Sequence, residues 1–513
     1  MTDVRIVTEA LGGSPLSRAL QQRRAPAEWT VEAPSSPAAW RARAAARGAA
    51  RDWSSTWRCL APALEASGAA GERLQRVIDA RGVVVTTGQQ PGLFGGPIYT
   101  LSKAVSTIAL ADALEEATGI PTAPLFWAAT DDADFAEASS TAVARQGGLE
   151  VLRSEHAPPA GTPMSLAPLG DLHVLLERLF AAAGSAADPR PLELVRAAYG
   201  SPEPATVGSA FVQLLRRLLQ PLGMAVLDAS HDGVWAASAG VLKRALASAQ
   251  EIEAALRVRS AAIRASGFEP QVEDVPGLSL VFVRERTLKR RLAVGETVDG
   301  DARLTPNVLL RPVLEHEILP TVAYVAGPGE LAYFAQVGPV ASTLSLDAPI
   351  AVPRWSCTLV EPQVEKLMER LDATEGDLVS EGELESRLAR GALGADATSA
   401  LQRLRETLAA LPEWMRGSAD ALNLDRAVQG AAGAMQHRAD RLERRLLAAV
   451  KRRETSLMSD VATLRASLRP RGKPQERVLN PIPILARQGM PLLEEMRDAA
   501  RPHARSLLTG KSG

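Results

Sequence analysis

The stretch VVVTTGQQPGLFGGPIYTLSKA, residues 83–104, decides the fold class. Its three leading valines form a short apolar run of the kind that a fully buried strand requires. A glycine-rich turn follows, and Pro97 stands where the first helical residue is expected, a position that favours proline. A buried strand that passes through a turn into a helix is one unit of a parallel α/β sheet.

Three further apolar runs, at 124–129, 224–227 and 321–325, also end in turn residues. Helical patterns follow the first and the last of the four runs. This rhythm predicts an α/β fold with a mostly parallel sheet. Residues 278–294 instead predict two antiparallel strands around a charged turn, and Glu315-His316-Glu317 is expected to be a solvated segment.

The remaining segments are expected to surround or extend this core. We expect an N-terminal helical segment at 1–75, a core at 76–360, a coiled-coil hairpin at 361–470, and a C-terminal segment at 471–513 that returns to the core. The core is expected to carry inserted connecting segments near 143–215 and 240–320, of which 143–215 and 240–277 are expected to be helical. In the N-terminal segment, Trp53 and Trp57 are spaced to share one helix face that packs on the core.

The hairpin is predicted from apolar residues at helical spacing, namely Leu446, Val450, Leu457, Val461, Leu464 and Leu468. Helix breakers are expected to separate its two long helices, at Gly391, Gly394, Pro412 and Gly417. Three of the apolar residues, Val450, Leu457 and Leu464, repeat at heptad spacing. Because one antiparallel partner covers only part of such a stripe, we expect a homodimer that buries the rest.

Composition excludes several classes of protein. The 513 residues carry 58 basic and 59 acidic side chains, so no global charge attracts nucleic acid or an anionic membrane. Two cysteines without metal-ligand spacing argue against a disulfide framework and structural zinc. The apolar runs are far shorter than the ~18 residues of a membrane span, and the first residues lack a secretory pattern. We therefore expect a cytoplasmic protein without a nucleic-acid or membrane partner.

Ligands of open parallel sheets bind beyond the carboxyl ends of the strands. The first turn offers Gly88, Gln89, Gln90, Gly92 and Gly96, whose glycines permit close backbone approach and whose amides can bind a ligand. The helix that follows begins at a natural anion site. Lys103 lies in the second turn of that helix, and the sequence fits a site residue and a surface lysine equally well.

The second turn places three carboxylates within four positions, Asp131, Asp132 and Asp134. Such carboxylates repel each other unless a cation, a substrate amine or solvent relieves them. They could bind Mg²⁺ or an ammonium group, or one could act as a general base. The alternative is a helix N-cap with acids in the first turn, which explains one or two of the three.

The third turn, at 326–329, precedes a helix in which Glu330, Tyr333 and Gln336 lie on a similar face. Its backbone amides at Gly327 and Gly329 could form an anion site, and a plain turn is the competing reading. The six histidines show no metal-ligand spacing, so no bound metal is predicted.

Five strings in this sequence resemble one protein family, the bacillithiol-biosynthesis cysteine-adding enzymes, or BshC family. They are VVTTGQQPGLFGGPIYTLSKA, PLFWAATDDADF, PNVLLRPVLEHEILPTVAYVAGPGELAYFAQV, PRWSCTLVE and KPQERVLNPI. They occur in order from about residue 75 to 490. The resemblance implies a Rossmann-like core related to nucleotidyltransferases and class I tRNA synthetases, with a C-terminal coiled coil used for dimerisation.

The resemblance also implies an activity, the joining of cysteine to the amine of glucosaminyl-malate. Asp132, Asp134 and Glu330 are then the expected catalytic residues. The binding residues expected in addition to the three turns are Tyr99, Lys103, Trp127, Arg311 and Tyr333, with Gln475, Glu476, Arg477 and Asn480 closing the site from the tail.

Amide formation from a carboxylate needs activation, most simply by ATP, with ADP and Mg²⁺ as possible further ligands and no tightly bound metal. The chain departs from the family pattern at Ala133, Ser139 and Ser140, where histidine and an asparagine-histidine pair are usual, and at Gly338, where lysine is usual. These departures leave a second reading open, a dimeric binding or scaffold protein with a degenerate ligase core.

Overall fold

The computed structural model describes residues 3–185, 187–200, 205–380 and 382–510, which form two compact units. The first unit contains residues 1–143, 151–359 and 476–513, and the second contains 144–150 and 360–475. None of the helices in the described ranges combines the length and apolar character that a membrane crossing needs.

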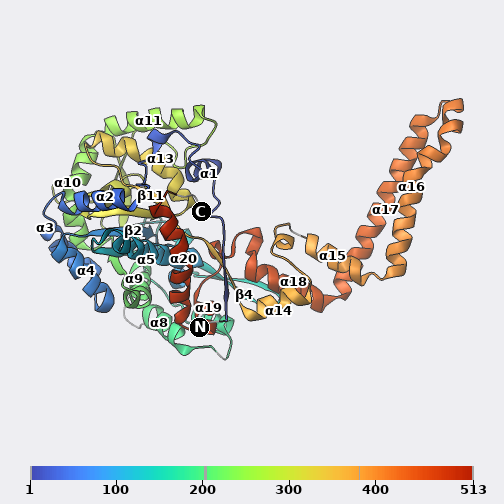
Figure 1. Cartoon of the computed structure of the whole chain (residues 1–513), viewed down its shortest axis with the longest axis horizontal. Coiled ribbons are helices and arrows are strands. Elements are labelled where there is room, and N and C mark those ends of the chain that lie inside the picture. The colour runs from blue at the N-terminus through green and yellow to red at the C-terminus, as the bar shows by residue number, and fades with distance from the viewer. Residues whose placement is uncertain (1–2, 186, 201–204, 381, 511–513) are drawn as a thin grey trace. The chain divides into compact units, whose positions relative to one another are not determined.

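A five-stranded parallel sheet, in the order β11-β10-β2-β3-β6, forms the centre of the first unit as far as its residues are described (Figure 1). The strands are β2 (Val83–Gln89), β3 (Thr122–Ala128), β6 (Ala225–Asp228), β10 (Thr321–Ala326) and β11 (Ala351–Pro353). All four predicted strands are therefore confirmed, as is the α/β class. The chain leaves β2 for β3 on one side and later returns to β10 on the other, so β2 lies at the switch in strand order.

The first unit contains the helices α1 (Pro15–Gln21), α2 (Pro37–Ala49), α3 (Ser54–Leu64), α4 (Gly68–Ala80), α5 (Ile98–Thr118), α6 (Phe135–Ala138), α7 (His173–Ala183), α8 (Pro189–Tyr199), α9 (Val207–Leu219), α10 (Asp232–Ala247), α11 (Ala249–Ala265), α12 (Arg311–Ile318), α13 (Pro328–Thr343), α19 (Ile482–Gln488) and α20 (Pro491–Leu508). The strands of the central sheet are buried, and helices such as α5, α9 and α13 pack on them, while other helices of the first unit pack on those helices or on the smaller sheets. Helix α5 is apolar on nearly all sides, since it contacts the sheet and α20 together. Trp53 and Trp57 are both buried in the main core, as their spacing indicates.

Three small sheets accompany the central one. They pair β1 (Arg5–Thr8) with β12 (Cys357–Val360), β4 (Ser140–Arg145) with β5 (Gly148–Arg153), and β7 (Leu278–Glu285) with both β8 (Leu288–Ala293) and β9 (Arg303–Pro306). The predicted strands within 278–294 are confirmed and are antiparallel. The insertion expected to be helical from 143 begins instead in the β4–β5 hairpin, because Gly147 and Gly148 adopt the positive φ angles, 82° and 152°, of its turn.

The second unit is mainly helical, with residues 144–150 of the β4–β5 hairpin added to it. Its helices are α14 (Pro362–Arg370), α15 (Glu383–Ala392), α16 (Ala395–Leu422), α17 (Asp425–Arg453) and α18 (Thr455–Leu468). Helices α16 and α17 form the antiparallel hairpin, which confirms the predicted coiled coil (Figure 1). The predicted breaks at Pro412 and Gly417 are wrong, since both residues lie inside α16. The turn forms at Asn423, whose φ of 54° ends the helix in the left-handed conformation.

The expected exposed heptad stripe is also wrong. The helix is interrupted at Glu454, so Val450 lies in α17 while Leu457 and Leu464 lie in α18. Val450 packs with Ala389 of α15, and Leu464 is fully buried. Contacts within one chain therefore satisfy the two ends of the stripe.

Candidate functional site

A polar cavity of about 840 Å³ opens at the carboxyl edge of the parallel sheet. Its walls come from the ends of three strands: residues 88–90 at the end of β2, 129 and 131–134 after β3, and 327–330 after β10. The small β7–β8–β9 sheet adds side chains such as Phe282 and Lys289. The cavity therefore lies where the strand order reverses around β2, which is where open α/β sheets bind ligands.

Lys103 is buried, and all three of its donors are used. Its Nζ lies 2.6 Å from the Gly88 carbonyl, 3.0 Å from Gln89 Oε1 and 2.6 Å from Glu330 Oε2. Burial lowers the pKa of Lys103, and the Glu330 carboxylate offsets part of that shift. The surface reading of Lys103 is thus wrong. The lysine ties the end of β2 to the start of α13.

Glu330 is the residue on which this wall depends. Its Oε2 accepts a 2.6 Å hydrogen bond from the N–H of Gly327, the N-cap of α13, and so satisfies a backbone donor at the start of that helix. Burial by itself would raise the pKa of Glu330, but the charges of Lys103 and Arg311 outweigh it and hold the pKa below its usual range. Glu330 therefore stays ionised. Because its own carboxylate occupies Gly327 N–H, that amide is not free for an anion.

Arg311, at the start of α12, joins the same set of charges. Its Nη2 lies 2.8 Å from the Tyr333 hydroxyl and its Nη1 lies 3.2 Å from Glu315 Oε2. Lys103, Arg311, Glu315 and Glu330 are called the ion network below. Both tyrosines beside it, Tyr324 and Tyr333, have pKa values raised by burial and stay protonated at neutral pH.

The prediction of a solvated Glu315-His316-Glu317 segment is wrong, because α12 buries its first two side chains. Glu315 is 1% exposed and His316 is 3% exposed. Burial raises the pKa of Glu315 to about 7, although Arg311 opposes the shift. Burial, reinforced by Arg47 and Arg43, lowers the pKa of His316 well below its usual value. Short-range sequence could not show this, because α12 is covered by segments distant in the chain.

The opposite wall carries carboxylates at residues 131–137, here called the acidic loop. Asp131 pairs with Lys289, whose Nζ lies 3.4 Å from Asp131 Oδ2 and 2.9 Å from the Asp131 carbonyl. Asp132 Oδ1 accepts a 2.8 Å hydrogen bond from Asp134 N–H. Burial raises the pKa of Asp132 in spite of that bond, and the neighbouring carboxylates Asp131 and Asp134 raise it further.

Asp134 and Glu137 complete the acidic loop. Asp134 Oδ1 accepts a 3.1 Å hydrogen bond from Ala136 N–H and caps the short helix α6, as the alternative reading of this residue required. Glu137 has an exposed side chain that accepts a hydrogen bond from Gln90. Partial desolvation, followed by the charges of Asp134 and Asp132, raises the pKa of Glu137. Within the described ranges, no three side chains of His, Cys, Asp or Glu converge as metal ligands do.

The C-terminal tail occupies the glycine turn after β2. Asn480 Nδ2 lies 3.0 Å from the Phe94 carbonyl and 3.2 Å from the Gly96 carbonyl, and the Leu479 carbonyl accepts from Ile98 N–H at 2.8 Å. The amide at the start of α5 is thus occupied by protein. Glycine is still favoured at position 96, because the backbone there adopts a φ of 78°.

Glu476 anchors the tail by a buried ion pair. Its oxygens lie 2.6 and 2.8 Å from the two terminal nitrogens of Arg354, and the hydroxyls of Ser102 and Ser356 also donate to it. Both charged side chains are 3% exposed. This pair places the next residue, Arg477, at the cavity with its side chain exposed.

Comparison with known proteins matches almost the whole of this chain to one family. Residues 58–300 and 296–355 match the model described as "Bacillithiol biosynthesis BshC, N-terminal Rossmann-like domain", and 357–507 match the "C-terminal coiled-coil domain" of the same family. The chain belongs to the BshC family. It is 32% identical over 471 residues to the "Putative cysteine ligase BshC" of Solibacter usitatus, with 86% of each chain covered. The protein of the same name from Heliobacterium modesticaldum is 33% identical, with 84% of each covered.

Most residues expected in this BshC site line the one cavity: Gly88, Gln89, Gln90, Tyr99, Lys103, Asp132, Asp134, Arg311, Gly327, Gly329, Glu330, Tyr333 and Arg477. The structure does not bring six others to it, namely Gly92, Gly96, Trp127, Gln475, Glu476 and Asn480. Gly96, Glu476 and Asn480 instead take part in the contacts that hold the C-terminal tail against the core. Trp127 lines a smaller neighbouring pocket, and Gln475 donates to the Ser467 carbonyl within the second unit.

Sequence reasoning missed Lys289 and Arg291 of β8 and Glu137 of the acidic loop, all of which line the cavity. The charged string around 285–291 was the available signal, but only tertiary packing turns these side chains toward β3. The structure also shows where two of the residues that depart from the BshC pattern lie. Ala133 lines the cavity without an imidazole, and buried Ser139 donates to the Ala136 carbonyl at 3.0 Å.

Gln336, expected on the site face of α13, is fully buried and lies outside the cavity. Its amide accepts from Val272 N–H at 3.0 Å and donates to the Val272 carbonyl at 2.8 Å. Gln336 therefore fixes the chain before β7 rather than a ligand.

Proposed function

We propose that this BshC-family chain forms the amide bond between the carboxyl group of cysteine and the amine of glucosaminyl-malate. The observation that carries the proposal is the convergence of three strand ends on one polar cavity of about 840 Å³ in a chain that matches the family over nearly its whole length. The cavity has one acidic wall and one wall of buried, paired charges. The acidic wall suits an amine, and Arg477, exposed at the cavity, suits a carboxylate.

Asp132 is the proposed general base. An amine attacks an activated carboxyl group only after it loses a proton, and the base that takes it works best when its pKa lies near the working pH. The raised pKa of Asp132 moves it in that direction. Asp134 and Glu137 would attract the ammonium form. Glu330 acts as a positioning residue, since Lys103 and Gly327 already occupy its Oε2.

We propose ATP as the cosubstrate that activates the cysteine carboxylate. Attack of that carboxylate on the α-phosphorus releases pyrophosphate and leaves an acyl-adenylate, whereas attack on the γ-phosphorus releases ADP and leaves an acyl-phosphate. The amine then displaces AMP or phosphate, and its proton passes to Asp132. Two features support a phosphate site: Arg477 is exposed at the cavity, and the space beside Gly329 is open within 4 Å. Mg²⁺ would enter with the nucleotide.

The test is a reconstituted reaction. The full-length protein is incubated with L-cysteine, glucosaminyl-malate and MgATP, and each component is omitted in turn. Mass spectrometry should detect the cysteinyl product only in the complete mixture, and the nucleotide product, AMP or ADP, distinguishes the two routes. Binding of glucosaminyl-malate without product under every nucleotide condition would overturn the ligase and favour the scaffold reading.

We also propose that the chain self-associates through the α16–α17 hairpin. Among large apolar side chains of this hairpin, Trp414 is 67% exposed, Leu442 is 48% exposed and Leu422 is 65% exposed. A second copy is the occupant we favour because the hairpin repeats apolar and charged residues as coiled coils do. Light scattering should give the mass of a dimer for the wild type and of a monomer for Leu442→Glu. A monomeric wild type would overturn this proposal.

A further inference from the structure

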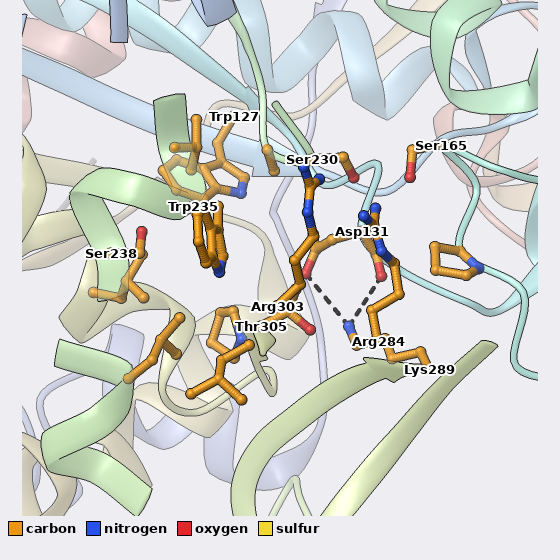
Figure 2. A pocket seen from close by; sticks show the side chains of 17 residues that line it. Trp127, Asp131, Ser165, Ser230, Trp235, Ser238, Arg284, Lys289, Arg303 and Thr305 are labelled. Carbon is orange, nitrogen blue, oxygen red and sulfur yellow. Dashed lines mark hydrogen bonds and ion pairs between the residues drawn. The ribbon is translucent and has the colours of Figure 1, made fainter. Parts of the chain in front are cut away.

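A second, smaller pocket of about 40 Å³ lies beside the main cavity and shares Asp131, Lys289 and Pro306 with it. A buried water needs roughly 10–15 Å³ by this measure, so the pocket has room for about three waters or for one small polar group. Figure 2 shows its labelled side chains, with the indole rings of Trp127 and Trp235 on one side and Asp131 and Lys289 on the other.

Four polar groups that line this pocket have no hydrogen-bond partner among the described residues. They are Trp127 Nε1, Ser230 Oγ, Ser238 Oγ and Thr305 Oγ1. Trp127 is 2% exposed and Ser238 is 3% exposed, so bulk water does not satisfy them. Buried polar groups are almost always hydrogen-bonded, and an indole N–H can only donate. The pocket therefore requires an occupant that accepts hydrogen bonds.

Of the three cationic side chains that line this pocket, two are paired with carboxylates and one is not. Lys289 pairs with Asp131, and Arg303 pairs with Asp232. The guanidinium of the third cation, Arg284 of β7, makes no hydrogen bond or ion pair in the part of the chain that the structure describes. Burial lowers the pKa of Arg284 and the nearby charge of Arg303 lowers it further, while Asp232 opposes them. An anion in the pocket would relieve both unfavourable effects.

We propose that this pocket is a carboxylate subsite, in which Arg284 pairs with a carboxylate of the substrate while Trp127 and Thr305 donate hydrogen bonds to it. An anion that needs an ion pair and several donors within a volume of about 40 Å³ fits a carboxylate better than a phosphate group with its larger shell of oxygens. The assignment of that carboxylate to cysteine or to the malyl group of the acceptor rests on the proposed function. That the pocket binds a carboxylate is argued from its own side chains and does not depend on the proposed function.

The subsite would orient the substrate across the two spaces. Because Asp131 and Lys289 line both pockets, a molecule held by its carboxylate in the small pocket extends past them into the main cavity. Its reacting group then meets the acidic loop. Three positioned contacts at one end of the substrate restrict the rotation of its other end, which is how remote binding groups assist catalysis.

Isothermal titration calorimetry on the full-length protein tests the subsite. L-malate and L-cysteine are titrated separately, with cysteamine as the probe that lacks a carboxylate. Arg284→Gln should weaken binding of at least one carboxylate at least ~10-fold, as loss of a charge-assisted hydrogen bond does. Thr305→Val, which keeps the shape, should weaken it ~3- to 10-fold. Arg244→Gln, an exposed arginine of α10, should leave it unchanged, and cysteamine should not respond to Arg284→Gln.

The probe whose affinity depends on Arg284 identifies the source of the carboxylate. Failure of both carboxylates to bind the wild type, or equal binding to wild type and Arg284→Gln, would overturn the subsite. The proposed function is read separately from product formation. Arg284-dependent binding without any product would leave the subsite standing and remove the ligase. If Arg284→Gln formed product with an unchanged KM for both substrates, the ligase would stand and the subsite would be overturned.

Discussion

The two walls of the main cavity hold their charges in different ways. In the ion network, Lys103 and Glu330 side chains are 5% and 14% exposed and lie 2.6 Å apart. In the acidic loop, Asp134 and Glu137 are exposed and four carboxylates share one lysine. In the first wall, Lys103, Arg311 and Glu330 keep their charges because each has a partner of opposite sign. The second contains groups that can gain or lose a proton when a substrate arrives, which is what acid–base chemistry requires.

The largest effect is expected from Glu330→Gln. This change removes the negative charge that faces two buried cations, Lys103 and Arg311. Breaking a buried ion pair from one side costs about 3–5 kcal/mol, so the free energy of unfolding should fall by that amount in urea denaturation. Glu137→Gln on the exposed wall should change it by less than about 1 kcal/mol. If the two substitutions lowered the free energy of unfolding equally, the proposed difference between the two walls would be wrong.

Asp132→Asn should come next and should affect activity rather than stability. Loss of the base predicts a decrease of at least ~100-fold in kcat/KM, with folding stability altered by about 1 kcal/mol or less. Asp171→Asn is the matched control, because Asp171 accepts a 2.9 Å hydrogen bond from His173 N–H at the start of α7 but does not line the cavity, and it should keep wild-type activity.

The pH profile gives a second readout of the same residue. Protonation of Asp132 should reduce wild-type kcat/KM toward acid, and because its pKa is raised, the decline should begin above the usual carboxyl range. An Asp132→Asn variant with wild-type activity would reassign the base.

Glu315→Gln tests the buried side of the ion network through the pH dependence of stability. The folded-state pKa of Glu315 is about 7, against 4.5 for the free side chain, so the folded state binds this proton more tightly than the unfolded state. Ionisation of Glu315 therefore lowers wild-type stability as pH rises from 5 to 8, whereas glutamine stays neutral. Relative to wild type, the variant should gain roughly 2–3 kcal/mol between these pH values. A constant difference in urea denaturation across this range would contradict the raised pKa.

The smallest effect is expected from Glu137→Gln on the pH profile of the reaction. Removal of one negative charge near Asp132 makes its ionisation easier, so the acid limb of kcat/KM should move to lower pH by a few tenths of a unit. Stopped assays at closely spaced pH values would resolve it. A shift toward higher pH would show that Glu137 does not act on Asp132 through its charge.

Local sequence signals are enough to find the strands and the three turns of the site. Each central strand is an apolar run of the length that only a doubly covered sheet accepts, and a turn of small or acidic residues follows each. Because parallel strands end on the same side of a sheet, these signals alone place Gly88, Asp132 and Gly327 at one edge.

Signals of this kind fail where the partner of a residue lies far along the chain. Gly96 has the local features of an anion site, yet Asn480 contacts its carbonyl across 384 positions. The local pattern around Lys103 fits a surface lysine equally well, yet its partner Glu330 comes from another strand end. Pro412 is typical of a helix break, but the helix continues through it and turns at Asn423, where a left-handed cap is available.

The sequence by itself determined the α/β class, the helical hairpin and the family, because these follow from the periodicity of apolar residues and from long strings of matched residues. Only the tertiary structure decided which charged groups are buried, which are paired and which face the cavity. Burial and pairing set the pKa of Glu315 and Asp132 through desolvation and neighbouring charge, and both quantities depend on residues brought together from distant segments.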